Sequence, residues 1–213
     1  IGIGAWLGGG PCTAARLGDQ GEKAESLGFH SFWLPENHFG QGNSIPAPLL
    51  LLAAVASRTS TLKLGTGSYL IPIRHPVQMA EEVAVLDELS QGRVILGVGR
   101  GYQSGMFEVF ETSAQEKRKN FEAGLKRMFD AWQGKPVGYD VAPRDSKPGT
   151  RGEPMYLSPR PAQKPHPPVW VAAFGPKALE QAGRLGLPYL ASPVETPEAL
   201  ERNFSLHREA CEK

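Results

Sequence analysis

Short apolar segments alternate with amphipathic segments along this chain, and that alternation restricts its fold more than any other feature. The apolar segments are predicted to be strands, at residues 1–7, 29–34, 62–71, 93–98, 169–174 and 188–191. The segments between them repeat apolar residues at helical spacing, as Leu17, Ala24 and Leu27 do in one and Met79, Val83, Leu86 and Leu89 in another, which predicts a buried face for each. Strands that alternate with helices predict an α/β fold whose parallel sheet has helical crossovers.

Helices are expected at residues 14–27, 46–57, 76–91, 121–132, 177–185 and 197–211. Proline and glycine mark several of their ends. Pro76 stands in the first turn of its helix, where its missing N–H costs no hydrogen bond, and Gly28 follows the end of another helix. Residues 135–168 are rich in proline and charge and have no clear periodicity, so we expect a long excursion over the surface.

Two closures of such a sheet compete, an open doubly wound sheet and a barrel. The segment GVGRGYQSG, residues 97–105, tests the first. A dinucleotide-binding turn needs G-x-G-x-x-G after the first strand, whereas this segment has Tyr102 at the third position and follows a later strand. The barrel is therefore favoured, and in a barrel the ligand groups come from loops that follow the strands.

Unusual residues follow four of the predicted strands. They are Glu36-Asn37-His38, Gly67-Ser68, Arg100-Gly101-Tyr102 and Gly175-Pro176-Lys177. Each group has an ordinary structural explanation, such as a polar loop or a helix start. Four such groups at one topological position indicate a functional site instead.

Composition excludes several classes of partner. Lys plus Arg number 23 and Asp plus Glu 22, so the net charge of +1 gives no reason to expect nucleic acid or an anionic membrane. No apolar stretch approaches the ~20 residues of a spanning helix. Cys12 and Cys211 form no disulfide framework, and two free thiols indicate a reducing, cytoplasmic location.

The chain resembles the bacterial luciferase-like flavin-dependent monooxygenase family from its first strand to its end. The resemblance rests on FWLPENHF, ASRTSTLKLGTGSYLIPIRHP, LDELSQGRVILGVGRGYQSGMFEVF and PHPPVWVAAFGPKALEQAGRLGLP. It implies a TIM-type (β/α) barrel that binds reduced FMN at the strand C-terminal mouth and uses dioxygen to oxygenate a small organic substrate. Members often depend on a separate flavin reductase, which is the protein partner that the resemblance implies.

The resemblance also implies cofactor-binding residues. Arg100 and Arg118 match arginines that hold the FMN phosphate, for which a guanidinium is well suited. The backbone of Phe174, Gly175 and Lys177 matches a phosphate loop at a helix N-terminus, although Pro176 offers no N–H. Four further residues match positions around the flavin ring: Gly67 and Ser68, at a non-proline cis peptide beneath it, and Gly99 and Tyr102, which flank it.

The catalytic candidates are Glu36, Asn37 and His38. The family often reads E-H-H-F here, and its first histidine handles protons, but this chain has Asn37 at that position. Asparagine donates a hydrogen bond but cannot accept a proton at neutral pH, so light emission is not expected. His38 is either a base or orienting group, or a structural residue. No metal site is predicted.

Two alternative functions stay open. The first is a deazaflavin-dependent hydride-transfer oxidoreductase, whose members commonly place a glutamate where this chain has Arg100-Gly101-Tyr102; that difference favours FMN. The second is a flavin-binding protein without catalysis, to which the Asn37 substitution and the short chain both give some weight.

The length also departs from a complete barrel. The 213 residues supply about six strand–helix units, whereas eight units typically need ~250 residues. We therefore expect one luciferase-like domain, residues 1–213, that is incomplete at its C-terminus or, alternatively, a natural compact variant. The helix at residues 46–57 is apolar beyond one core face, which predicts a homodimer contact.

Overall fold

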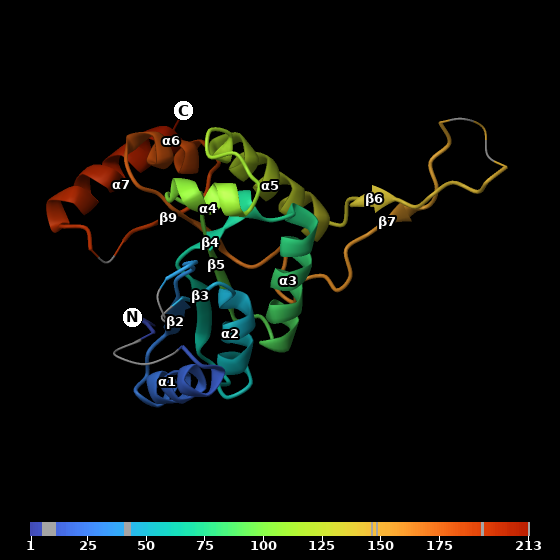
Figure 1. Cartoon of the computed structure of the whole chain (residues 1–213). Coiled ribbons are helices and arrows are strands. Elements are labelled where there is room, and N and C mark those ends of the chain that lie inside the picture. The colour runs from blue at the N-terminus through green and yellow to red at the C-terminus, as the bar shows by residue number, and fades with distance from the viewer. Residues whose placement is uncertain (6–11, 41–43, 146, 148, 193, 213) are drawn as a thin grey trace.

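A parallel sheet organises the computed structural model, which describes residues 1–5, 12–40, 44–145, 147, 149–192 and 194–212. Its main path runs in the order β1 (Gly2–Gly4), β2 (Ser31–Leu34), β3 (Lys63–Thr66), β5 (Val94–Gly99), β8 (Val169–Ala172) and β9 (Tyr189–Leu190) (Figure 1). Every neighbouring pair on this path is parallel. The predicted parallel order is therefore confirmed; residues 6 and 7 of the first predicted strand lie outside the described residues.

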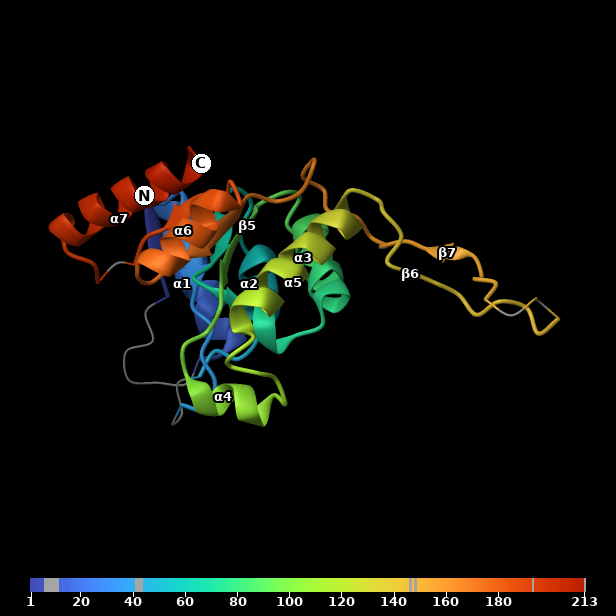
Figure 2. The same cartoon turned by 90° about the horizontal axis from the view of Figure 1, so that it is seen from above.

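Helices cover one face of this curled sheet, as the two perpendicular views show (Figures 1 and 2). They are α1 (Ala14–Ser26), α2 (Pro48–Ala56), α3 (Pro76–Leu89), α5 (Lys117–Trp132), α6 (Pro176–Arg184) and α7 (Pro197–Cys211). Thr13 caps α1 by accepting a hydrogen bond from the N–H of Arg16, and Pro76 begins α3. None of the helices that the structure describes is both long and apolar enough to cross a membrane.

The pleat of the strands separates two faces of the sheet. Phe32, Leu34 and Leu64 point toward the helices and are at most 1% exposed. Trp33 and Trp170 lie on the opposite face, where their ring centroids are 5.7 Å apart and both residues are partly exposed. Helices therefore cover the outer face, and the inner face is that of an incomplete barrel.

Two predicted core residues are exposed at helix ends. Leu27 is the C-cap of α1 and is 62% exposed, and Leu89 is the last residue of α3 and is 63% exposed. Helical spacing predicted a buried face for each of them, but each stands at the end of its helix, where that face is no longer covered.

The single strand predicted at residues 62–71 is wrong, because the structure divides it into three parts. β3 ends at Thr66, β4 (Tyr69–Leu70) pairs with β5, and a short 3-10 helix, η1 (Ile71–Ile73), follows. The peptide bond Gly67–Ser68 between β3 and β4 is cis, as predicted. The N–H of Gly67 donates to the carbonyl of Leu34 at 2.8 Å and so keeps the end of β3 beside β2.

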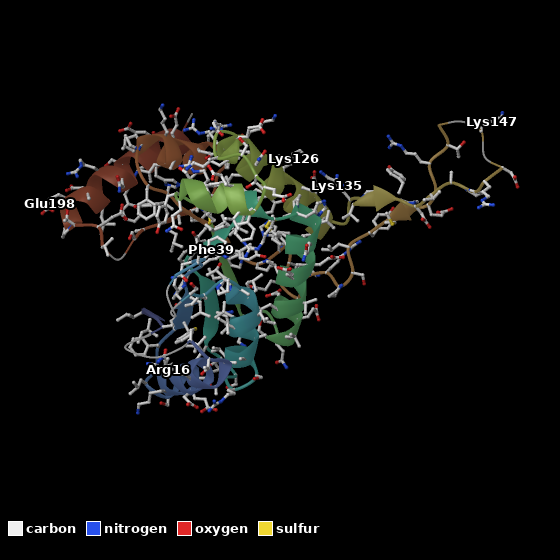
Figure 3. All side chains as sticks on the ribbon, in the orientation of Figure 1. Arg16, Phe39, Lys126, Lys135, Lys147 and Glu198 are labelled. Carbon is white, nitrogen blue, oxygen red and sulfur yellow. The ribbon has the colours of Figure 1, made fainter. Side chains whose placement is uncertain are left out.

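The excursion at residues 135–168 contains a short hairpin that the sequence did not predict. β6 (Gly138–Tyr139) and β7 (Pro154–Met155) pair antiparallel and project from the body, with Lys147 near the tip (Figure 3). Gln163 anchors the returning chain, because its side-chain amide donates to Oδ1 of buried Asp87 at 2.7 Å.

Candidate functional site

Parallel strands bring their C-terminal ends to one edge of the sheet, called here the mouth. The residues that directly follow β2, β3, β5 and β8 therefore lie along this edge, and they include the four unusual segments of the sequence. The mouth is thus the place at which the predicted site residues can act together.

Arg100 leaves the end of β5 and is partly buried. Its Nη1 donates to Oε1 of Gln181 in α6 at 3.0 Å, and it forms no ion pair with a carboxylate among the described residues. Burial lowers the pKa of Arg100, and so does the positive charge of Arg118 in the first turn of α5. Two cations thus lie close together at the mouth, and none of the described carboxylates pairs with Arg100.

The loop after β8 leads into the N-terminus of α6. Gly175 is the N-cap of α6 and has φ +81°, a left-handed conformation that favours glycine. Among the described residues, no backbone acceptor receives the N–H of Phe174, Gly175 or Lys177. Free N–H groups at a helix N-terminus favour an anion.

Ser68 lies directly against Gly99. A Cβ added at Gly99 would be 2.2 Å from the hydroxyl oxygen of Ser68, so the absence of a side chain at Gly99 is what permits this contact. Beyond it, Tyr102 is 80% exposed. The structure therefore brings Ser68 and Gly99 together and leaves the ring of Tyr102 projecting into solvent.

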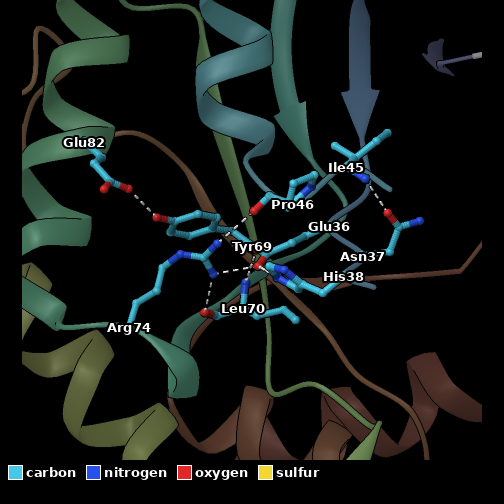
Figure 4. A network of polar contacts seen from close by, with 9 residues as sticks. All are labelled: Glu36, Asn37, His38, Ile45, Pro46, Tyr69, Leu70, Arg74 and Glu82. Carbon is cyan, nitrogen blue, oxygen red and sulfur yellow. Dashed lines mark hydrogen bonds and ion pairs between the residues drawn. The ribbon is translucent and has the colours of Figure 1, made fainter. Parts of the chain in front are cut away.

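Glu36 ties the end of β2 to the chain around β4 (Figure 4). Its side chain is fully buried, and Oε1 lies 2.6 Å from Nη1 of Arg74 and 2.6 Å from Nε2 of His38. Its other oxygen accepts the N–H of Leu70 at 2.9 Å. The carboxylate is therefore occupied on both oxygens and balanced by the Arg74 cation.

Asn37 is held in one orientation by Ile45. Its side-chain oxygen accepts the N–H of Ile45 at 2.5 Å, and its own N–H donates to the carbonyl of Ile45 at 3.1 Å. The amide nitrogen of Asn37 points away from Ile45 (Figure 4). The side-chain NH₂ of Asn37 is therefore the group that it can offer as a hydrogen-bond donor to a ligand.

His38 lies between the Glu36 carboxylate and an aromatic ring. It is 9% exposed, and its ring meets that of Phe110 edge to face at a centroid distance of 4.9 Å. Phe110 caps α4 (Ser104–Val109), a helix that the sequence did not predict. α4 covers a second small core formed by Leu70, Ile73, Met106 and Phe107.

Two residues that support the predicted site were missed in the sequence. Gln181 holds Arg100, and Arg74 holds Glu36 from 38 positions away. The sequence hints at the role of Gln181, because it is a polar residue on the same face of α6 as the apolar residues Ala178 and Ala182. Nothing in the sequence predicts the role of Arg74, since only the tertiary fold brings it to Glu36.

Known proteins are similar to this chain in sequence and in fold. The family model for luciferase-like monooxygenases matches residues 1–213. The oxygenase component of a flavin-dependent trigonelline monooxygenase from Acinetobacter baylyi is 29% identical over 196 residues, which cover 89% of this chain and 52% of that protein.

Solved structures agree with this match. The monooxygenase RslO1 from Streptomyces bottropensis superposes with a TM-score of 0.77 at 32% identity, over 94% of this chain and 61% of that one. The oxygenating constituent of 3,6-diketocamphane monooxygenase from Pseudomonas putida, solved with FMN, shares the fold with a TM-score of 0.78 at 21% identity, over 99% and 61% of the two chains.

The chain spans about half the length of the curated relatives that it matches, between 46% and 54% of each. Its sheet order, the mouth and the match over every residue nevertheless agree. This chain belongs to the luciferase-like monooxygenase family.

Proposed function

We propose that this chain is the flavin-binding part of a monooxygenase that uses reduced FMN and dioxygen to oxygenate a small organic substrate. The observation that carries the proposal is Arg100, a partly buried cation beside Arg118 that has no carboxylate partner among the described residues. A phosphate dianion at this point would offset both charges and receive charge-assisted hydrogen bonds.

In this proposal the mouth divides into a phosphate end and a ring end. Arg100 and Arg118 hold the phosphate, together with the N–H groups of Phe174, Gly175 and Lys177. Gly67, Ser68, Gly99 and Tyr102 would border the flavin ring. Reduced FMN supplies the electrons that activate dioxygen. The residues of the chain bind and orient the cofactor.

Glu36, Asn37 and His38 would serve the reacting end of the site. Asn37 acts as a donor, because Ile45 occupies its side-chain oxygen. Where Nε2 of His38 donates to Glu36, its Nδ1 keeps a lone pair that can accept a proton. Glu36 fixes the histidine and is itself fixed by Arg74. Any base at this site is therefore His38, with Glu36 as its positioning residue.

The proposal extends to the assembly. The 213 residues act as one luciferase-like domain in the cytoplasm, consistent with free cysteines at Cys12 and Cys211. A separate flavin reductase supplies the reduced cofactor. A homodimer forms through α2. This helix is apolar on all sides, and its Leu50 is 74% exposed, so a second copy would cover an apolar face that the chain itself leaves open.

The test is the binding of FMN and of riboflavin, which has the same ring without the phosphate. Arg100→Ala should weaken FMN roughly ten- to hundredfold, since a lost charge-assisted bond costs about 1.5–3 kcal/mol. Riboflavin affinity should hardly change. Arg118→Ala should have the same selectivity with a smaller effect, because Arg118 is exposed. Flavin fluorescence titrations of wild type and both variants with each ligand, at fixed salt, measure these affinities.

Other results would point to the alternatives. Equal losses for FMN and riboflavin would make Arg100 a residue of the fold, and no loss would make it a surface cation. Tighter binding of a deazaflavin cofactor than of FMN would favour hydride transfer. Flavin binding without oxygen consumption, in the presence of a reductase and candidate substrates, would favour a non-catalytic protein.

A further inference from the structure

Gln181 is a buried polar residue on the helix that begins at the mouth. It is 3% exposed, among the core residues Ala178, Leu179 and Ala182 of α6. Burial of an amide is unfavourable unless its hydrogen bonds are made inside the protein. The contacts of this side chain therefore explain why a glutamine is tolerated there.

The amide of Gln181 joins three elements. Its oxygen accepts from Nη1 of Arg100, after β5, at 3.0 Å. Its nitrogen donates to Oε1 of Glu122 at 2.8 Å and to the backbone carbonyl of Arg118 at 3.3 Å, both in α5. Arginine can only donate and a carboxylate can only accept, so the partners fix which way the amide faces.

Glu122, the nearby carboxylate, is engaged by other groups. It pairs with Arg184, and although burial raises its pKa, the bonds from Gln181 and Arg184 lower that pKa overall. The neutral amide of Gln181 stands between this anion and Arg100. Arg100 thus receives an acceptor that holds its guanidinium in place without neutralising its charge.

We propose that Gln181 is a positioning residue that orients Arg100 through a neutral acceptor and so keeps its charge available for the phosphate of the flavin. This inference rests on the proposed function, because it concerns the same phosphate site. A glutamate at position 181 would fill nearly the same space but would pair with Arg100 and compete with the bound anion.

The test exchanges the amide and the carboxylate. In Gln181→Glu/Glu122→Gln, the side chain at position 181 still accepts from Arg100 and the new amide at position 122 can donate to it, so the bridge from Arg100 to α5 is kept. The exchange gives up the 3.3 Å bond to the carbonyl of Arg118 and the ion pair of Glu122 with Arg184, so Glu122→Gln alone is measured beside it. Gln181→Leu removes the acceptor altogether. Glu180→Gln, at the exposed neighbouring position of α6, is the matched control.

Dissociation constants for FMN and riboflavin are measured by flavin fluorescence at fixed ionic strength, with urea midpoints to report folding. The exchange variant should bind FMN at least about tenfold more weakly than Glu122→Gln does, with riboflavin affinity within twofold of wild type and a urea midpoint close to that of Glu122→Gln. Gln181→Leu should weaken FMN severalfold with the same selectivity. Glu180→Gln should match wild type for both ligands.

The outcomes separate this inference from the proposed function. If Arg100→Ala loses FMN selectively while the exchange variant binds it as wild type does, the role of Gln181 is overturned and the phosphate site stands. Equal losses of FMN and riboflavin in the exchange variant would also overturn it, because they would mark a structural amide. If Arg100→Ala shows no selectivity, the phosphate site fails and this inference fails with it.

Discussion

Glu25, near the C-terminal end of α1, fastens this helix to the segment that leads into β3. Its carboxylate accepts the backbone N–H groups of Ser60, Thr61 and Leu62, at 3.0, 2.6 and 2.8 Å, and the hydroxyl of Thr61 at 2.9 Å. Burial raises the pKa of Glu25, but the hydrogen bonds from Thr61, Leu62 and Ser60 outweigh it and lower the pKa to about 2. The ionised form is therefore the one that the fold stabilises.

Glu25→Gln should lower the free energy of unfolding at pH 7 by on the order of 1–2 kcal/mol, because an amide NH₂ would then face backbone donors. The folded pKa of about 2 lies below the reference value of 4.5. The contribution of Glu25 is therefore complete above about pH 4.5 and is lost as the pH falls toward 2.

Urea midpoints of wild type and variant at pH 7 and pH 3 measure this effect, and the difference between the two proteins should shrink at pH 3. Glu81→Gln, on the exposed side of α3, is the control and should have little effect at either pH. A loss of the same size at both pH values would mean that Glu25 acts by packing.

At the scale of the element, two strands approach each other more closely than side chains would permit. A Cβ added at Gly97 in β5 would lie 2.0 Å from the carbonyl oxygen of Thr66 in β3. Thr66 also donates its hydroxyl to the carbonyl of Gly97 at 2.8 Å. Glycine at this position is therefore a condition for the pairing of β3 and β5 near the mouth.

Gly97→Ala should destabilise the fold by roughly 2–3 kcal/mol, because the methyl group can be accommodated only if the two strands separate. Gly105→Ala in α4 is the matched control, since a Cβ there meets nothing within 4 Å. It should be neutral or stabilising by up to about 1 kcal/mol through helix propensity. Urea denaturation compares the two variants, and equal effects would contradict the argument.

The helices that the sequence predicted are those with enough residues to show a period. α7 was predicted at its observed bounds because its pattern runs over 15 residues between Thr196 and the chain end. α4 has six residues, includes Gly105 and buries only Met106 and Phe107, so it gave no periodic signal. β6 and β7 have two residues each and are defined by their pairing alone.

The same division holds for the candidate site. Topology placed Asn37, Ser68, Arg100 and Gly175 at one edge, because a parallel sheet sends every strand end there. The residues that hold them come from other elements: Ile45 orients Asn37, and Gln181 orients Arg100 from 81 positions away. Those contacts depend on how the chain packs, and no spacing in the sequence encodes them.

At the scale of the whole molecule, the hairpin of β6 and β7 stands apart from the rest. It projects away from the sheet in both views (Figures 1 and 2), and within it β6 pairs with β7. Apolar side chains remain exposed on it, with Val141 at 88% and Tyr156 at 52%. The hairpin therefore contributes little to the core that forms the mouth.

Replacing residues 140–153 by Asn-Gly should join Tyr139 to Pro154 through a two-residue hairpin turn. The free energy of unfolding should change by no more than about 0.5 kcal/mol, as for other surface changes. FMN affinity should be unchanged. Urea denaturation and flavin titration test both points. A clear loss of FMN affinity would mean that the hairpin reaches the binding site in solution.

The indole pair on the inner face of the sheet has an optical consequence. Trp33 lies 5.7 Å from Trp170, and a Cβ added at Gly67 would be 3.9 Å from the Trp33 ring, so the pair adjoins the edge proposed to hold the flavin. Isoalloxazines absorb where tryptophan emits. A flavin bound there would quench the emission of both indoles by energy transfer. The tryptophan fluorescence of the protein would therefore fall as the flavin binds, which reports occupancy of the site without a label.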